Sequence, residues 1–169
     1  MNQSAERQLW ELVQRQLITE TLQDYCHHVD RNDPAGLAEH VFCADGCFEL
    51  GSRHAVVGSE QLKLMFARTL APFRMTSHHL SNVKIRFSGD TTAESTAYVH
   101  AWHIADDDGH RIDLWGRYHD RLRLTSAGWR IASRRLLVAG TDGWQEPPFE
   151  LPERLPNPAN PPSPHIVRR

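Results

Sequence analysis

Residues 77–88 read SHHLSNVKIRFS, and the pattern in this stretch decides the fold class. Its apolar side chains Val83, Ile85 and Phe87 alternate with lysine and arginine, a period of two that is typical of a half-buried strand. Further strand-like segments follow, separated by turns rich in glycine, aspartate and serine, at 93–106, 110–125 and 128–139. The second half therefore predicts an antiparallel meander. Because these strands are long, we expect a strongly curved sheet with bulges or glycines at its bends.

The half that precedes this stretch is predominantly helical. Residues 8–30 carry apolar side chains at steps of three and four, which predicts a long helix. Asp33, followed by a proline, marks the start of a second helix, and Ser59 is expected to cap a third. Two short strands are expected between the second and third helices, at 47–50 and 54–57. Helices followed by a meander indicate an α+β fold whose helices pack on one face of the sheet.

The composition excludes several classes of protein. The chain has 169 residues, 40% of them hydrophobic, as expected for one globular domain. A net charge of −2 argues against nucleic-acid binding. No apolar run approaches the roughly 20 residues of a membrane span, and the N-terminus lacks a signal-peptide core, so we expect a cytoplasmic protein. The three cysteines suit neither a disulfide framework nor a structural zinc site, for which a second pair of ligands is missing.

Proline marks the boundary of the globular domain. Eight of the ten prolines fall between Pro147 and Pro164, where they prevent helix and central strand. We therefore expect a domain over residues 1–143 and an extended tail over 144–169, docked on its own or a neighbouring subunit. Three apolar residues are expected to anchor the start of this tail: Trp144, Phe149 and Leu151.

A curved sheet covered by helices leaves a concave apolar cavity, which is the place to look for a site. Asp30 ends the long helix, where it is either a solvated helix end or a cavity carboxylate. His78 and His79 are adjacent on a strand, so only one of them can enter the cavity, and a bulge near residues 80–82 would exchange the two. The pattern alone does not decide between them.

Other polar residues of the strands are candidates for the same cavity. His103 shares a strand face with the apolar Val99 and Ala101, whereas His100 faces the other way. Tyr118 either offers its phenol to a ligand or packs in the core. One of two adjacent arginines, 134 and 135, should point inward, and a cavity arginine requires an anionic partner.

The chain resembles the SnoaL-like branch of the nuclear transport factor 2 (NTF2) superfamily over roughly residues 8–138. The resemblance rests on the order and spacing of five motifs: Ile18 … Tyr25 … Val29-Asp30-Arg31-Asn32-Asp33, Phe42-x-x-Asp45, His78-His79-Leu80-Ser81-Asn82, Gly116-Arg117-Tyr118-His119-Asp120 and Gly128-Trp129-Arg130-Ile131. It implies a cone-shaped α+β barrel. The pattern is most similar to the group of scytalone dehydratase, bile-acid 7α-dehydratase and hexachlorocyclohexane dehydrochlorinase.

The resemblance also implies site residues. It assigns an Asp–His catalytic pair to Asp30 and His78, a polar contact to Tyr25, a second histidine to His103 and a pocket arginine to Arg134. The substrate-binding residues that we expect are Tyr118, Arg134, Phe48, Met65 and Ala101.

The implied activity is that of a lyase without a metal or organic cofactor. It would abstract a proton and eliminate water or another leaving group from a cyclic, largely apolar small molecule. An isomerase or cyclase using the same base is a close variant. The alternative class is a non-catalytic subunit, such as a ring-hydroxylating dioxygenase β-subunit, or a small-molecule-binding module. Family members form dimers or trimers, so we expect a homo-oligomer, preferably a trimer.

Overall fold

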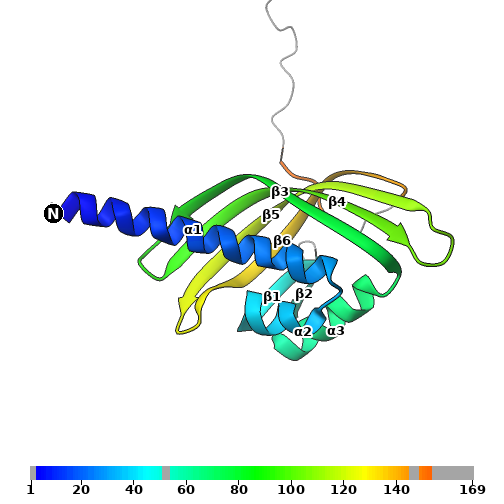
Figure 1. Ribbon diagram of the computed structural model, residues 1–169, viewed down its shortest axis with the longest axis horizontal. Coiled ribbons are helices and arrows are strands. Elements are labelled where there is room, and N and C mark those ends of the chain that lie inside the picture. Colours follow the sequence, from blue (N-terminus) through cyan, green and yellow to red (C-terminus); the bar gives the residue numbers. More distant parts are fainter. Residues whose placement is uncertain (1–2, 51–53, 145–148, 154–169) are drawn as a thin grey trace, which may run out of the picture.

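The computed structural model describes residues 3–50, 54–144 and 149–153, which form three α-helical segments, one π-helical turn and six strands (Figure 1). In chain order these are α1 (Gln3–Asp30), α2 (Pro34–Gly36), η1 (Leu37–Val41), β1 (Phe42–Leu50), β2 (His54–Val57), α3 (Ser59–Leu70), β3 (Phe73–Phe87), β4 (Thr92–Ala105), β5 (Arg111–Thr125) and β6 (Gly128–Asp142).

The six strands form one curled sheet that does not close into a barrel, with strand order β2-β1-β6-β5-β4-β3 (Figure 1). The meander β3–β6 is antiparallel throughout, as the strand-like segments separated by turns predicted. β1, which precedes the meander in the chain, pairs in parallel with β6, its last strand. The predicted α+β cone is therefore confirmed. The parallel pairing of β1 with β6 was not part of the prediction.

Bulges give the meander its curvature. The β3–β4 register shifts between Ser81 and Lys84, where Asn82 adopts a positive φ of 50°. The β5–β6 register shifts at Gly116, where a Cβ atom would lie 2.6 Å from the carbonyl oxygen of Leu137. The first of these bulges lies in the region where the sequence allowed one.

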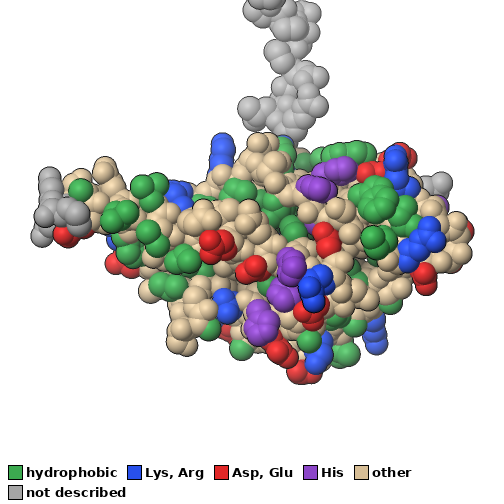
Figure 2. Space-filling model, in the orientation of Figure 1, with side chains coloured by type: hydrophobic (Ala, Val, Ile, Leu, Met, Phe, Trp, Pro, Cys, Tyr) green, Lys and Arg blue, Asp and Glu red, His purple; other side chains and the backbone are tan. Residues whose placement is uncertain are grey.

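The core fills the space between the sheet and the helices that pack on one of its faces. α1 contributes its C-terminal half, including Ile18 and Leu22, which are 0% exposed. The first turns of α1 extend beyond the sheet (Figure 1), and Figure 2 shows apolar side chains at this end of the molecule. α1 exposes the side chains of Leu9, Leu12, Val13 and Leu17, whereas Trp10 packs on Phe87 of β3. The apolar periodicity of the predicted helix is therefore used by the core only in its second half.

Three details of the first half differ from the sequence prediction. The second helix is one α-helical turn followed by the π-helical η1, and β1 begins at Phe42 instead of Cys47. The predicted cap at Asp33 is confirmed, since its carboxylate accepts a hydrogen bond from the Gly36 N–H at 2.9 Å. The predicted cap at Ser59 is wrong, because Gly58 with φ 86° is the N-cap and the Ser59 hydroxyl instead donates to carbonyl groups of the preceding segments.

The described part of the tail lies against the sheet. The Val138 N–H donates to the Glu150 carbonyl at 2.8 Å, and Arg135 forms an ion pair with the Glu150 side chain. Trp144 and Phe149 pack on the core, whereas Leu151 is 77% exposed and anchors nothing. Within the described ranges, the structure contains no helix with the length and apolar character needed to cross a bilayer.

Candidate active site

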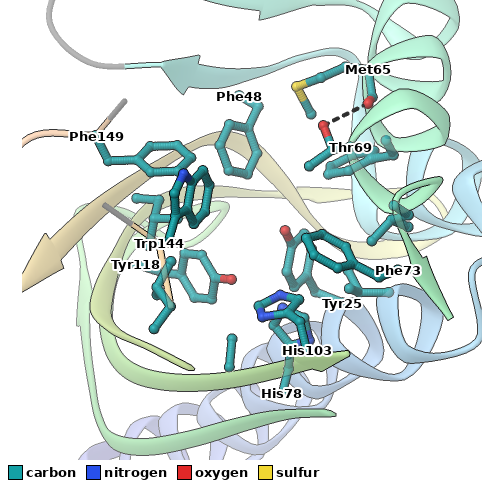
Figure 3. A pocket seen from close by; sticks show the side chains of 16 residues that line it. Tyr25, Phe48, Met65, Thr69, Phe73, His78, His103, Tyr118, Trp144 and Phe149 are labelled. Atoms are coloured by element: carbon teal, nitrogen blue, oxygen red, sulfur yellow. Dashed lines mark hydrogen bonds between the residues drawn. The ribbon is translucent and has the colours of Figure 1, made fainter. Parts of the chain in front are cut away.

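A cavity of about 750 Å³, including its mouth, lies between the curled sheet, α1 and α3 (Figure 3). Its walls are mostly apolar and aromatic, with a few polar groups, as in sites for small organic ligands. The lining residues are Tyr25, Val29, Phe48, Met65, Phe66, Thr69, Leu70, Phe73, His78, Ala101, His103, Leu114, Tyr118, Leu136, Trp144 and Phe149.

His78 lines this cavity and contacts Asp30, an exposed residue at the end of α1 that is not itself a lining residue. Asp30, the last residue of α1, accepts hydrogen bonds from the His78 ring Nδ1 at 2.8 Å, the His78 backbone N–H at 2.9 Å and the Thr76 hydroxyl at 2.8 Å. Burial by itself would raise the pKa of Asp30, but these hydrogen bonds outweigh it and hold the pKa below the usual value. The ionised carboxylate therefore fixes the Nδ1–H tautomer of His78 and leaves Nε2 as an acceptor.

The bulge in β3 decides which of the two adjacent histidines enters the cavity. His78 lines the cavity, and its side chain is 8% exposed. His79 lies on the outer face, where its ring stacks on His100 of β4 at a centroid distance of 6.3 Å. The alternative that the alternation pattern left open is therefore resolved in favour of His78.

A close Asp–His contact is not by itself distinctive in this chain. His28 contacts Asp33 at 2.8 Å, and His100 contacts Asp113 at the same distance. Neither of these pairs lines the cavity, and His100 stacks on the exposed Trp115 of the outer face. The position of His78 in an apolar cavity, together with its carboxylate partner, is what distinguishes it.

His103 faces His78 across the corner of the cavity. The two rings are 5.4 Å apart and nearly perpendicular, and Phe73 packs on His103 at 4.7 Å. Burial, together with the nearby His78, lowers the pKa of His103 to about 4. His103 is therefore a neutral imidazole at neutral pH.

Two tyrosines form another part of the wall. The rings of Tyr25 and Tyr118 are 5.4 Å apart, and Figure 3 shows both projecting into the cavity. Burial raises the pKa of Tyr25 to about 12 and that of Tyr118 well above its usual value. Both phenols are therefore protonated at neutral pH and can donate hydrogen bonds to an oxygen in the cavity.

Arg134 lies behind the tyrosines and is not a lining residue. Its guanidinium is 4.0 Å from the ring centre of Tyr25 and 4.1 Å from that of Tyr118. It forms a bidentate ion pair with Asp120, with both N–O distances at 2.8 Å and both side chains 0% exposed. The anionic partner that the sequence required is thus a residue of the chain itself, which places Arg134 under the wall and out of direct reach of a ligand.

The remaining predicted binding residues and several others complete the wall. Phe48, Met65 and Ala101 line the cavity. Sequence reasoning missed Phe73, although its position directly after the helix-ending Pro72 was visible. It named Trp144 and Phe149 only as anchors of the tail, because their role depends on how the tail folds back.

One group of potential metal ligands occurs within residues 3–50, 54–144 and 149–153. Side-chain atoms of Asp107, Asp108 and His110 lie within 4.8 Å of one another. All three residues are exposed in the β4–β5 turn and lie outside the cavity.

The sequence of the chain matches a model of the SnoaL-like domain over residues 10–135. The chain belongs to the SnoaL-like family. Among curated proteins, none matches the sequence of this SnoaL-like protein significantly.

Solved structures agree with this assignment. A candidate scytalone dehydratase from Novosphingobium aromaticivorans is 26% identical with a TM-score of 0.81, over 87% of this SnoaL-like chain and 98% of its own. A hexachlorocyclohexane dehydrochlorinase from Novosphingobium barchaimii is 14% identical with a TM-score of 0.71, and the match covers 80% of this chain and 92% of the dehydrochlorinase chain. An NTF2-like protein from Salmonella enterica is 22% identical with a TM-score of 0.68, and the match covers 76% of this chain and 92% of the Salmonella chain. The latter two likenesses establish the NTF2-like fold alone.

Proposed function

We propose that this protein is a lyase that needs no cofactor and eliminates water or another leaving group from a cyclic, largely apolar small molecule. The observation that carries the proposal is the hydrogen bond of 2.8 Å between Asp30 and His78 at the wall of an apolar cavity. The dehydratase and dehydrochlorinase names of the similar structures support the reaction class, because both name eliminations.

In the proposed reaction, Nε2 of His78 takes a proton from a carbon atom of the substrate. This carbon is acidic because it lies next to a carbonyl group or next to the carbon that bears the leaving group. The electron pair of the broken C–H bond forms the double bond, and the leaving group departs with the electron pair of its bond to carbon. A departing hydroxide would take a proton from Tyr25 or Tyr118 and leave as water, and the proton on His78 would return to that phenolate through solvent. Asp30 stabilises the imidazolium that forms and keeps the ring in place. Such proton transfer by a positioned side chain accelerates a reaction about 10²- to 10⁴-fold.

The other polar groups act on the oxygen side of the substrate. Tyr25 and Tyr118 remain protonated and would donate hydrogen bonds to a carbonyl oxygen or a developing enolate. Neutral His103 lies next to His78 and would hydrogen-bond the departing oxygen. Phe48, Met65 and Ala101 would bind the ring by apolar contact. Arg134 would support the tyrosines from behind, since its guanidinium lies against both rings and it does not line the cavity.

A second candidate function is a binding module in which the Asp30 contacts are purely structural. Asp30 receives three hydrogen bonds from β3, which fasten the end of α1 to the sheet. The same fastening would suit a non-catalytic subunit, since it requires no substrate. An isomerase or cyclase would use the same base and differ only in the fate of the carbanion.

The experiment compares turnover by the wild type and by matched histidine variants. Substrates are bicyclic and tricyclic β-hydroxy ketones, followed by absorbance of the enone, and hexachlorocyclohexane, followed by chloride release. We expect His78→Ala and Asp30→Asn to lose at least 100-fold in kcat. His100→Ala removes a histidine with an equally short carboxylate contact on the outer face and should leave kcat unchanged.

Full activity of His78→Ala would overturn the assignment of the base. Ligand binding without turnover of any substrate, with circular dichroism showing an intact fold, would favour the binding module. Exchange of the substrate α-protons in D₂O without elimination would instead indicate the isomerase variant.

We further propose a cytoplasmic homo-oligomer, preferably a trimer. The outer face of the meander exposes large apolar side chains, namely Met75, Tyr98 and Trp115 at 60%, 40% and 45%. Covering such a face favours association. Sedimentation of the wild type and of Trp115→Glu tests this, and a wild-type monomer would contradict it.

A further inference from the structure

A second hollow of about 860 Å³, including its open side, lies next to the cavity. It is formed where the start of β3 meets the β4–β5 turn, at the opposite end of the meander from the β3–β4 turn (Figure 1). Its lining residues are Ala71, Pro72, Phe73, Ala105, Asp106, Asp107, His110, Ile112 and Trp144. We call the first space the inner cavity and this one the outer pocket.

The two spaces are adjacent because they share walls. Phe73 and Trp144 line both of them, and both side chains are half-buried. Phe73 packs on His103 of the inner cavity, so the shared wall begins beside the proposed base. The backbone around the shared wall is fixed, since the Asp106 N–H donates to the Pro72 carbonyl at 2.8 Å and the Thr141 hydroxyl donates to the Trp144 carbonyl at 2.6 Å.

The outer pocket has a different chemistry from the inner cavity. Its floor is apolar, with Pro72 and Ile112, but its rim carries the carboxylates of Asp106 and Asp107. Two basic side chains lie at the same turn: His110, which contacts the Asp108 carboxylate at 2.5 Å and lies within 4.8 Å of that of Asp107, and Arg74, whose guanidinium lies beside Gly109. Three consecutive carboxylates, at 106–108, oppose these two groups, so the rim is acidic on balance. The inner cavity, in contrast, has His78, His103 and the tyrosines as its polar groups and an otherwise apolar wall.

We infer that the inner cavity and the outer pocket together form one extended binding site, joined past Phe73 and Trp144. Its substrate is an elongated molecule with an apolar ring in the inner cavity and a second part that reaches the outer pocket. The rim carboxylates favour a cationic group at that end, accept a hydroxyl and repel a carboxylate. This inference rests on the proposed function for the reacting end, and it adds the substrate class: cationic or neutral amphipathic ring compounds.

The experiment measures binding, so it does not depend on turnover. The probes are three biphenyls that differ only in the para substituent: aminomethyl, hydroxymethyl and carboxylate. They are titrated calorimetrically into the full chain at neutral pH and low ionic strength. We expect the amine to bind about tenfold more tightly than the carboxylate, with the alcohol between them, because two nearby carboxylates act in opposite directions on the two charges.

Variants test whether the preference arises in the outer pocket. Asp106→Asn combined with Asp107→Asn should reduce the ratio of amine to carboxylate affinity at least threefold. Asp90→Asn removes the same charge from the turn at the other end of the meander and should leave the ratio unchanged. Trp144→Ala should weaken all three probes, because it removes the wall common to both spaces.

Several results would overturn the extended site. These are failure of all three probes to bind, equal affinities for them, or a preference that survives the double substitution. Loss of the preference in Asp90→Asn would equally show that it reflects net charge alone. Repeating the titrations with His78→Ala keeps the two proposals apart, since the order of affinities should persist in a variant that has lost turnover.

Discussion

The Arg134–Asp120 pair gives a prediction whose size follows directly from the structure. Both side chains are 0% exposed, and two N–H groups of the guanidinium donate to the two carboxylate oxygens at 2.8 Å. Asp120→Asn keeps the size of the side chain but removes its charge, which leaves a buried guanidinium without a counter-ion. Removing one partner of a buried ion pair costs about 3–5 kcal/mol. We expect the free energy of unfolding to fall by this amount.

The matched control is an exposed pair of the same residue types. Asp45 pairs with Arg123, and the two side chains are 71% and 45% exposed. Because exposed ion pairs contribute about 0–1 kcal/mol, Asp45→Asn should change the unfolding free energy by no more than that. The difference between the two variants isolates the effect of burial.

Urea unfolding followed by tryptophan fluorescence, at one fixed protein concentration, provides the measurement. A second variant, Arg134→Met with Asp120→Leu, removes both charges and should recover most of the loss, since apolar replacements of buried pairs are often neutral. A cost below 1 kcal/mol for Asp120→Asn, or a double variant no better than the single one, would refute the view that the cation depends on its partner.

Three further perturbations have defined outcomes. The pKa of His103 is about 4 in the folded state and about 6.5 when unfolded, so the native state binds fewer protons between these values. The unfolding free energy of the protein should therefore decrease by up to about 3 kcal/mol as the pH falls from 6.5 to 4. The His103→Gln variant should lack this pH dependence in urea titrations. Gly116→Ala places a Cβ atom 2.6 Å from the Leu137 carbonyl oxygen and should cost about 1–3 kcal/mol, seen as a lower midpoint in urea. Asp33→Ala removes the cap on Gly36 and should cost about 1 kcal/mol, measured by thermal unfolding; no loss would contradict the capping role.

The sequence predicted the features that depend on local patterns. Alternation in residues 83–87 gave the strand, and Asp33 before a proline gave the helix start, because both signals lie within a few neighbouring residues. The pairing of Asp30 with His78 joins residues 48 positions apart, and only the family resemblance suggested it.

Other features depend on tertiary contacts that no local pattern contains. The choice between His78 and His79 follows from a register shift between β3 and β4. The partner of Arg134 is set by the pairing of β5 with β6, and the place of Trp144 in the wall is set by the return of the chain after β6. Each of these features depends on contacts between two separate segments of the chain, so the periodicity of a single strand could not predict it.

The three hydrogen bonds from β3 to Asp30 also constrain the order of events when the chain folds. The carboxylate ends α1, and its partners Thr76 and His78 lie in β3, after three helical segments (α2, η1 and α3) and two strands (β1 and β2). The His78 tautomer is thus set only when the first helix has docked on the meander. A nuclear magnetic resonance signal from the His78 Nδ1 proton would therefore report that docking step during refolding.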